Sequence, residues 1–302
     1  MSAVVTSPET NVSAAEREAG IRKRPSFTRR FLRHRMAAAS VVFIVFIAVA
    51  ALITPYVSPY DPYAMQLPEA RKPPSLQHPL GTDKLGRDTL TRVFVGGRVS
   101  IAVALAAVAI STVIGTLLGL IAGYWKGWAD AIISRITDMF MAFPLFVLLI
   151  VLVSMLGPSA TNVVLILGLF SWMVITRIVR GQVMAVMNEP YIEAAIAAGA
   201  RADRILLRQI MPNIYVPVVV AATLGVASAM LSEAALSFLG LGIQPPTPSW
   251  GNMLNEAQSL QVLVNEPWVW LGPGFAIALT VLSINFLGDG LRDALDPHSH
   301  NP

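Results

Sequence analysis

Residues 189–213 read EPYIEAAIAAGARADRILLRQIMPN, a polar stretch that interrupts a chain built largely of apolar segments. Pro190 suits the first position of a helix, where its missing N–H costs nothing. Gly199 can adopt the left-handed conformation that ends a helix. Asp203 can cap a second helix, because its carboxylate accepts hydrogen bonds from free backbone N–H groups. The stretch therefore predicts two short helices joined at Gly199.

Both predicted helices carry an apolar face at helical spacing. The apolar positions are Ile192, Ala195 and Ile196 in the first helix, and Ile205, Leu206 and Ile210 in the second. The arginines of the second helix, Arg201, Arg204 and Arg208, fall on a different side. A small apolar knob with a charged flank suits a groove on a soluble partner. A membrane-surface linker whose arginines bind lipid phosphates explains the same spacing equally well.

The composition indicates that the rest of the chain lies in a bilayer. Of 302 residues, 55% are hydrophobic and 13% are charged, against about 25% charged in soluble domains. The mean hydropathy is +0.62. Six stretches are long and apolar enough to span a membrane, near 36–54, 99–123, 136–156, 161–179, 213–238 and 269–288. Because lipid cannot satisfy an open strand edge, we expect an all-α integral membrane protein with six transmembrane helices.

Three of these stretches carry further signals. The first is longer than the apolar core of a signal peptide, so we expect a retained helix over 36–54. Phe143-Pro144 predicts a kink or local break in the third. Glycines 115, 119 and 123 recur every four residues in the second, which places them on one face where a neighbouring backbone can approach. The competing interpretation is that glycine is simply common in membrane helices.

The distribution of basic residues predicts the orientation. With a cytoplasmic N-terminus, 16 of the 22 Lys and Arg residues fall on the cytoplasmic side, which favours both termini inside. The predicted organisation is a basic tail (1–35), the first helix (36–54), an extracytoplasmic loop with a short interfacial helix (55–98), a core (99–290) containing the cytoplasmic loop 180–212, and a C-terminal tail (291–302). The six outer basic residues lie beside acidic ones and are largely offset locally.

The second outer loop, 240–268, is rich in proline and predicted to be extended. Trp250 is either an aromatic anchor at the membrane surface or a contact for a docking protein. Gln244 and Asn252 are the neighbouring candidates for docking or for an outer gate.

The sequence contains no pattern for catalysis, cofactor binding or metal binding. It has no Cys, and its four His are scattered. No HExxH, Gly-x-Ser-x-Gly or GxxxxGK[ST] motif occurs, so the chain cannot bind ATP through a P-loop. We expect no enzyme activity, no cofactor on this chain and no nucleic-acid partner. Glu233 is the one ionisable residue inside a predicted span, near its outer end. It is either an interface residue with a structural hydrogen bond or part of the outer mouth of a pathway. The candidate pathway residues are Ser228, Ser232, Glu233 and Asn285.

Two sets of motifs resemble a known family. Glu193-Ala194-Ala195, then Gly199, then Ile210-Met211-Pro212 resemble the EAA loop of permease subunits in ATP-binding-cassette importers, with Gln209 and Met211 departing from the usual Ile-x-Leu-Pro ending. HPLGTDKLGRD (78–88), AGYWKGWAD (122–130), SWMVITRIVRGQV (171–183), EAALSFLGLGIQPPTPSWGNM (233–253) and GDGLRDALDP (288–297) resemble the dipeptide/oligopeptide/nickel group, most closely the dipeptide permease C-type subunit.

The resemblance implies a type I ABC importer permease fold in the bacterial cytoplasmic membrane. It implies a second homologous permease, two ATPase subunits that bind ATP and Mg²⁺, an extracytoplasmic substrate-binding protein and a peptide substrate. The loop would then couple the bundle to the ATPase through Glu193, Ala194, Ala195, Ala198, Gly199, Arg201, Asp203 and Arg204. Three alternatives stay open: a nickel-chelate permease of the same group, a passive channel or secondary carrier, and a non-transporting scaffold.

Overall fold

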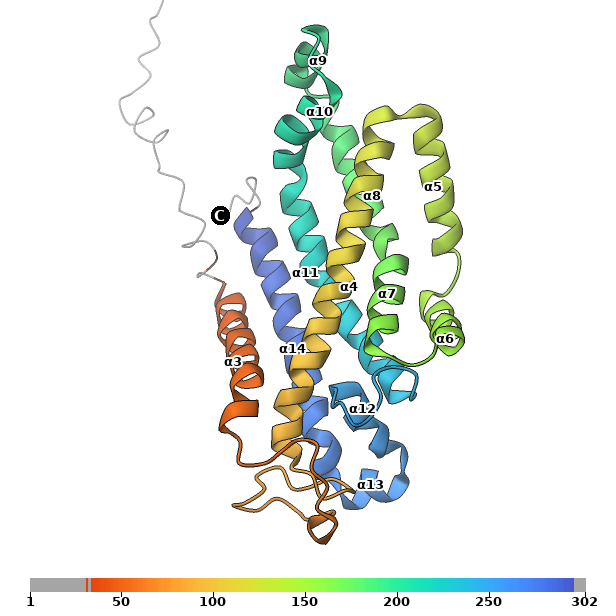
Figure 1. Cartoon of the computed structure of the whole chain (residues 1–302). Helices are drawn as coiled ribbons and strands as arrows, with labels where there is room; N and C mark the ends of the chain where they lie inside the picture. The colour runs from red at the N-terminus through yellow and green to blue at the C-terminus, as the bar shows by residue number, and fades with distance from the viewer. Residues whose placement is uncertain (1–30, 32–33, 296–302) are drawn as a thin grey trace, which may run out of the picture.

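The structure is a computed structural model that describes residue 31 and residues 34–295, and within that part of the chain all regular secondary structure is helical (Figure 1). The predictions for most of the N-terminal tail and for residues 296–302 lie outside the described residues. The C-terminal tail predicted from residue 291 is helical as far as Leu295, because the last helix continues through it.

Among the described residues, five helices or helix pairs are long and apolar enough to cross a membrane, and the predicted stretches other than 136–156 lie within them. They are α3 (Arg35–Val57), α4 (Thr89–Trp125), α7 with α8 (Ala160–Phe170 and Trp172–Val186), α11 (Met211–Phe238) and α14 (Pro267–Leu295). α11 continues without a break from α10 (Ala202–Ile205) and the π-turn η2 (Leu206–Ile210).

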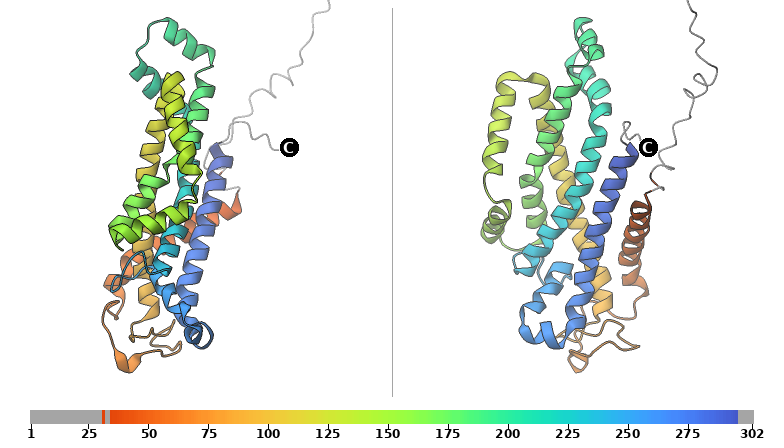
Figure 2. Two further views of the ribbon diagram at one scale, coloured as in Figure 1. Left: turned by 90° about the vertical axis from the view of Figure 1, so that its right-hand side faces the viewer. Right: turned by 180° about the vertical axis from the view of Figure 1, so that it is seen from behind.

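The stretch predicted as a third span is broken into α5 (Gly127–Met141) and α6 (Leu145–Leu156), which meet at 83°. The predicted break at Phe143-Pro144 is confirmed, and it divides the stretch 136–156 between two helices. Proline lacks an N–H and disfavours helical geometry in the residue before it, so the helix ends and restarts here. Figure 2 shows α6 lying across the bundle while α5 runs along it. The pair counts as a sixth span only if the two pieces are taken together.

The prediction of a short interfacial helix within 55–98, in the stretch GRDTLTRVFVGG (86–97), is wrong. Those residues begin α4, which is capped by Asp88 through a bond from the Thr91 N–H to Oδ2 at 2.8 Å and runs unbroken to Trp125. Val93, in the middle of this stretch, is 5% exposed and packs in the core rather than at an interface. No proline interrupts the helix here, and its Gly96 and Gly97 lie against Ser249 and Trp250 of the segment 239–266.

The predicted glycine face is confirmed. α4 packs along α8, and the three glycines of α4 lie against backbone carbonyls of that helix. A Cβ on Gly115, Gly119 or Gly123 would lie within 2.9 Å of an α8 side chain. The same contact brings the Thr176 hydroxyl within 3.2 Å of the Gly115 carbonyl oxygen. The absence of side chains on this face of α4 therefore sets the distance between the two helices.

Segments without predicted spans gather at the two ends of the bundle (Figures 1 and 2). α9 (Pro190–Ala197) and α10 form a projection at one end, which we call the loop end. Residues 58–88 and 239–266 cover the other end, which we call the cap. The second of these is not the extended loop we predicted, because it folds into α12 (Trp250–Leu254), η3 (Asn255–Gln258) and α13 (Leu260–Asn265). Ser249 and Asn252 form a reciprocal capping box at the start of α12.

Candidate functional site

The projection at the loop end has the predicted helix-turn-helix form. α9 begins at Pro190, and its last turn closes at Gly199, whose φ is +76°. The Gly199 N–H donates to the Ile196 carbonyl at 2.9 Å, and the next N–H donates to Ala195 at 3.0 Å. This left-handed turn confirms the role predicted for Gly199, because residues with a Cβ rarely adopt that conformation.

Asp203 does not cap the second helix. The flanking residue of α10 is Arg201, with extended backbone, and Asp203 lies in the first turn. Its Oδ1 is 3.4 Å from Arg201 Nε, and both side chains are largely exposed. The carboxylate sits two residues inside the helix start rather than before it, so it pairs with a neighbouring cation instead of the backbone.

The apolar face of the second helix is confirmed and that of the first is only partly right. Ile192, Ile205 and Ile210 are at most 1% exposed and pack in one cluster with residues of α8. Ile196 remains 46% exposed and Ala195 is half-buried. α9 reaches beyond the end of α8, so only its beginning finds a neighbour to pack against.

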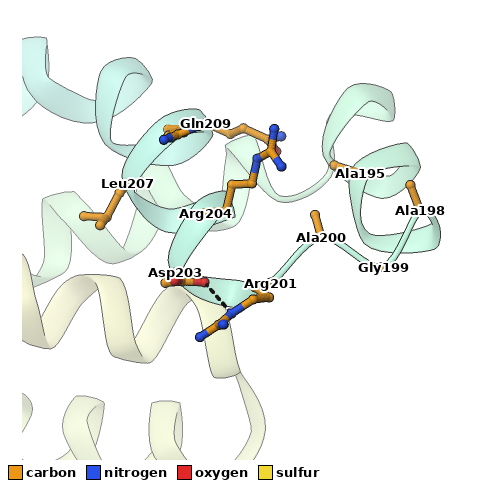
Figure 3. Close-up of a pocket in the computed structure, with 10 residues that line it drawn as sticks. Ala195, Ala198, Gly199, Ala200, Arg201, Asp203, Arg204, Leu207 and Gln209 are labelled. Atoms are coloured by element: carbon orange, nitrogen blue, oxygen red, sulfur yellow. Dashed lines mark ion pairs between the residues drawn. The ribbon is translucent and has the colours of Figure 1, made fainter.

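A hollow of 760 Å³ lies between the α9 turn and the start of α10 (Figure 3). Six of the eight predicted coupling residues line it: Ala195, Ala198, Gly199, Arg201, Asp203 and Arg204. Glu193 and Ala194 are exposed on α9 outside the lining. Leu207, Arg208 and Gln209 also line the hollow. The hollow is therefore open and polar at its rim, with small side chains on the α9 side.

A second cavity, of 430 Å³, lies between α4, the α5–α6 break, α7, α8 and α11, and some of its lining residues, Ser228 among them, are exposed. Its walls are apolar except for four serines: Ser111, Ser171, Ser228 and Ser232. The structure thus brings two of the four candidate pathway residues together at a cavity, while Glu233 and Asn285 lie elsewhere. Ser111 was missed because nothing in its sequence surroundings distinguishes it from a serine packed between helices.

Glu233 makes the structural hydrogen bond that one interpretation predicted, but it is buried and does not lie at an interface. Its side chain is fully buried, and its Oε1 accepts a hydrogen bond from Ser237 Oγ at 2.8 Å. The Ser237 hydroxyl oxygen in turn accepts from the Ile243 N–H at 3.0 Å. These two hydrogen bonds connect the end of α11 to the cap segment that folds back over it. Glu233 is buried because this segment covers it.

Trp250 was predicted at the surface, and this is wrong. Its side chain is 0% exposed, and its Nε1 donates to the Val93 carbonyl oxygen at 2.7 Å. The indole lies against Gly97, where a Cβ would come within 2.7 Å of the ring. The half-buried Asn252 donates to the carbonyls of Ile243 and Thr247. Gln244 is exposed, so among the three predicted outer residues it alone presents its side chain to a docking protein.

The cap contains several ion pairs, three of which link its two segments. Lys72 pairs with Glu69 and Arg87 with Asp83, both at 2.6 Å, which confirms the local offset of charge. Two glutamates of the second segment join them. Arg71 Nη1 is 2.9 Å from Glu266 Oε1, and the cations Lys84 and Arg87 lie 3.7 and 3.9 Å from Glu256 Oε1. These long-range pairs were missed because partners 195 residues apart, as Arg71 and Glu266 are, leave no periodic signal.

Among the described residues, no three His, Asp or Glu side chains group as metal ligands would.

A bundle of apolar helices with a cavity between them and a polar projection at one end is the arrangement of a membrane transport component. Residues 115–300 match the family described as the binding-protein-dependent transport system inner membrane component, and residues 26–74 match the N-terminal transmembrane domain of oligopeptide transport permease C. The chain belongs to this family and is a multi-pass inner membrane protein with the type I ABC permease fold.

Two relatives illustrate the similarity. A protein named as a peptide permease of Brucella suis biovar 1 is 44% identical over 270 residues, which are 89% of this chain and 89% of that protein. The glutathione transport system permease protein GsiD of Escherichia coli O6:H1 is 45% identical over 272 residues, 90% of this chain and 89% of the relative. The match covers nearly the whole of each protein.

Proposed function

We propose that this chain forms half of the translocation pathway of an ATP-driven importer of di- and oligopeptides. The names of its relatives, peptide permease and glutathione permease, support peptides over a nickel chelate. The other half would come from a second, homologous permease. A substrate-binding protein would deliver the peptide at the cap. The loop end would then be cytoplasmic, as would both termini, in agreement with the excess of Lys and Arg on that side.

The observation that carries the proposal is the exposed apolar surface of the projection. Tyr191 and Ile196 of α9 and Leu207, which directly follows α10, are 48%, 46% and 66% exposed. Figure 1 shows α9 and α10 projecting at one end of the bundle. Apolar side chains of this size, rimmed by polar residues, mark a surface that a partner covers. Arg201, Arg204 and Arg208 are exposed beside them and supply the polar rim.

The partner we assign to this surface is an ATPase subunit. The chain lacks a phosphate-binding loop, so ATP and Mg²⁺ would bind on two such partner subunits and no cofactor on this chain. The projection continues without a break into α11, which lines the cavity through Ser228 and Ser232. Movement of an ATPase subunit would therefore be transmitted along one helix to the cavity wall, and nucleotide would bias the bundle between two arrangements.

Reconstituted transporter tests this proposal through peptide-stimulated ATP hydrolysis. Gly199→Pro fixes φ near −65° where the turn needs +76°, and Glu193→Lys reverses an exposed charge on α9. Both variants should remain in the membrane and lose stimulation. Gly181→Ala is the matched control, because a Cβ there meets nothing within 4 Å. Unchanged stimulation in both variants would remove the projection from the mechanism.

A further inference from the structure

The cap encloses a small polar pocket that the proposed function does not use. Its volume is 90 Å³, about the share of three water molecules in the liquid. Residues from both segments of the cap line it, together with the start of α4 and one residue of α14. Lys84, 51% exposed at its side chain, and the exposed Pro245 stand at its edge. The pocket is thus open to the outside at the end opposite the projection.

The charges around this pocket do not balance. The charged lining residues are Lys84, Arg87 and Arg92, which are cationic, and Asp83 and Glu256, which are anionic. With all five ionised the pocket carries a net charge of +1. Burial raises the pKa of the Glu256 carboxyl, despite the nearby lysine and arginines, so protonation of Glu256 makes the pocket more positive. A desolvated excess of positive charge favours an anion.

Arg87 supplies the geometry for such an anion. Its side chain is 4% exposed, and its Nε donates to Asp83 Oδ2 at 2.6 Å. Its Nη2 lies 3.9 Å from Glu256 Oε1, too far for a hydrogen bond. No acceptor in the described part of the chain bonds the terminal nitrogens of Arg87, whereas Arg92 donates to the Pro62 carbonyl at 2.7 Å. A buried guanidinium that lines the pocket therefore has terminal donors that no acceptor in the described part of the chain uses.

We propose that this pocket receives the carboxylate of an aspartate or glutamate on the substrate-binding protein when that protein docks on the cap. An arginine fork matches a carboxylate through two parallel N–H bonds. Lys84 at the mouth would attract the anion and pair with it at the rim. The pocket is far below the roughly 300 Å³ at the lower end for small-molecule sites, so it fits a side-chain carboxylate and not a whole peptide. This inference rests on the proposed function.

The rival interpretation is that Glu256 itself is the partner of Arg87 and closes the small remaining distance. The two views predict opposite effects of Glu256→Gln. If Glu256 is the partner of Arg87, Glu256→Gln should destabilise the cap and weaken the docking of the substrate-binding protein. If Glu256 instead competes with an incoming carboxylate for Arg87, the same variant should strengthen docking, because one negative charge leaves the pocket.

The test measures the Kd of the purified substrate-binding protein, without peptide, for the complete transporter in lipid nanodiscs. Lys84→Gln and Arg87→Lys should each weaken binding about tenfold or more, since each removes part of a charge-assisted contact. Lys72→Gln is the matched control. Lys72 is a cation of the same segment, 49% exposed and paired with Glu69, and it does not line the pocket. The control should bind like the wild type.

Two further arms address the folding of the buried variant and the identity of the ligand. Lys84 lies at the surface, so its replacement tests the pocket even if Arg87→Lys fails to fold. Sodium acetate should displace the binding protein more effectively than sodium chloride at equal ionic strength, because acetate carries the proposed chemical group.

The outcomes separate the possibilities. Binding of the wild type with no change in Lys84→Gln, or weaker binding of Glu256→Gln, would overturn the inference while leaving the proposed function intact. No binding to the wild-type complex at all would instead count against the proposed function. A dependence on Lys84 that arises only with peptide-loaded binding protein would assign the carboxylate to the peptide and also overturn the inference.

Discussion

The indole Nε1 of Trp250 donates a hydrogen bond to the carbonyl oxygen of Val93, 157 residues earlier in the chain, at 2.7 Å. The backbone N–H of Trp250 also lies 3.2 Å from Ser100 Oγ on the same helix. One residue of the cap is therefore held to α4 at two points. The cap and the first turns of α4 form a single packed unit. Substitution of Trp250 therefore removes packing contacts inside this unit and does not alter an exposed binding surface.

Trp250→Ala should lower stability by about 3–5 kcal/mol, because it empties a filled site in the core. Trp250→Phe keeps most of the ring and should cost about 1–3 kcal/mol, since the bond to Val93 is lost. Thermal unfolding of the purified complex measures both. Trp128→Phe, at a tryptophan that is 79% exposed, is the control and should be near neutral. Equal effects of Trp250→Phe and Trp128→Phe would contradict the buried position.

Gly119→Ala should weaken the contact between α4 and α8. The new Cβ would lie 2.6 Å from the Val179 Cβ and 2.9 Å from the Thr176 carbonyl oxygen. Both neighbours belong to a helix and cannot move alone, so we expect a cost of about 1–3 kcal/mol in unfolding experiments. Gly181→Ala introduces the same methyl group into open space and should not destabilise the protein. If the two variants unfold at the same temperature, the close packing of α4 against α8 does not depend on its glycines.

The cysteine-free sequence allows a direct test of orientation. Single cysteines at Ser75 and Ser259, both exposed in the cap, should react with a membrane-impermeant thiol reagent added to intact cells with a permeable outer envelope. A cysteine at Ala202, in the projection, should react only after the inner membrane is opened. Labelling of Ala202→Cys in sealed cells would reverse the orientation and the proposed docking of an ATPase subunit with it.

Glu256→Gln should reduce the pH dependence of stability. Burial raises the pKa of Glu256 in the folded protein above its ordinary value of 4.5. The folded state therefore holds this proton more tightly than the unfolded state. The stabilisation that this bound proton provides is fully present below pH 4.5. It is lost as the pH rises through the pKa of Glu256 in the folded protein.

The unfolding midpoint measured from pH 4 to pH 8 checks this expectation. The wild type should lose more stability than Glu256→Gln over the rise from pH 4.5. Glu69→Gln, which removes a carboxylate from a surface pair with Lys72, is the control for a general loss of charge in the cap. A steeper decline in Glu256→Gln than in the wild type would show that its ionised form stabilises the cap.

Ser228→Trp should block transport by filling the cavity of 430 Å³ whose wall includes this serine. We expect peptide uptake to fall at least about tenfold, a loss that corresponds to about 1.4 kcal/mol, while the complex remains assembled. Val219→Trp places the same indole on α11 at a position that is 41% exposed and does not line the cavity. Uptake that falls equally in both variants would indicate damage to α11 rather than obstruction of a pathway.

The sequence by itself determined the features that depend on local rules. Apolar length predicted the membrane helices, Pro144 predicted the break between α5 and α6, and Gly199 predicted a left-handed turn. Gly115, Gly119 and Gly123 predicted the close approach of α4 to another helix. Each of these follows from the conformational range or size of one residue type at one spacing, so no knowledge of distant contacts was needed.

The tertiary structure alone decided which polar and aromatic residues are accessible. Trp250 and Glu233 read as residues of an interface, yet both are buried because residues 239–266 fold back over the end of the bundle. That return also brings Glu256 to Lys84 and Arg87 and creates the pocket in the cap. Spacing along a chain reports the face of one helix, whereas burial and charge pairing depend on segments that meet only after the chain has folded.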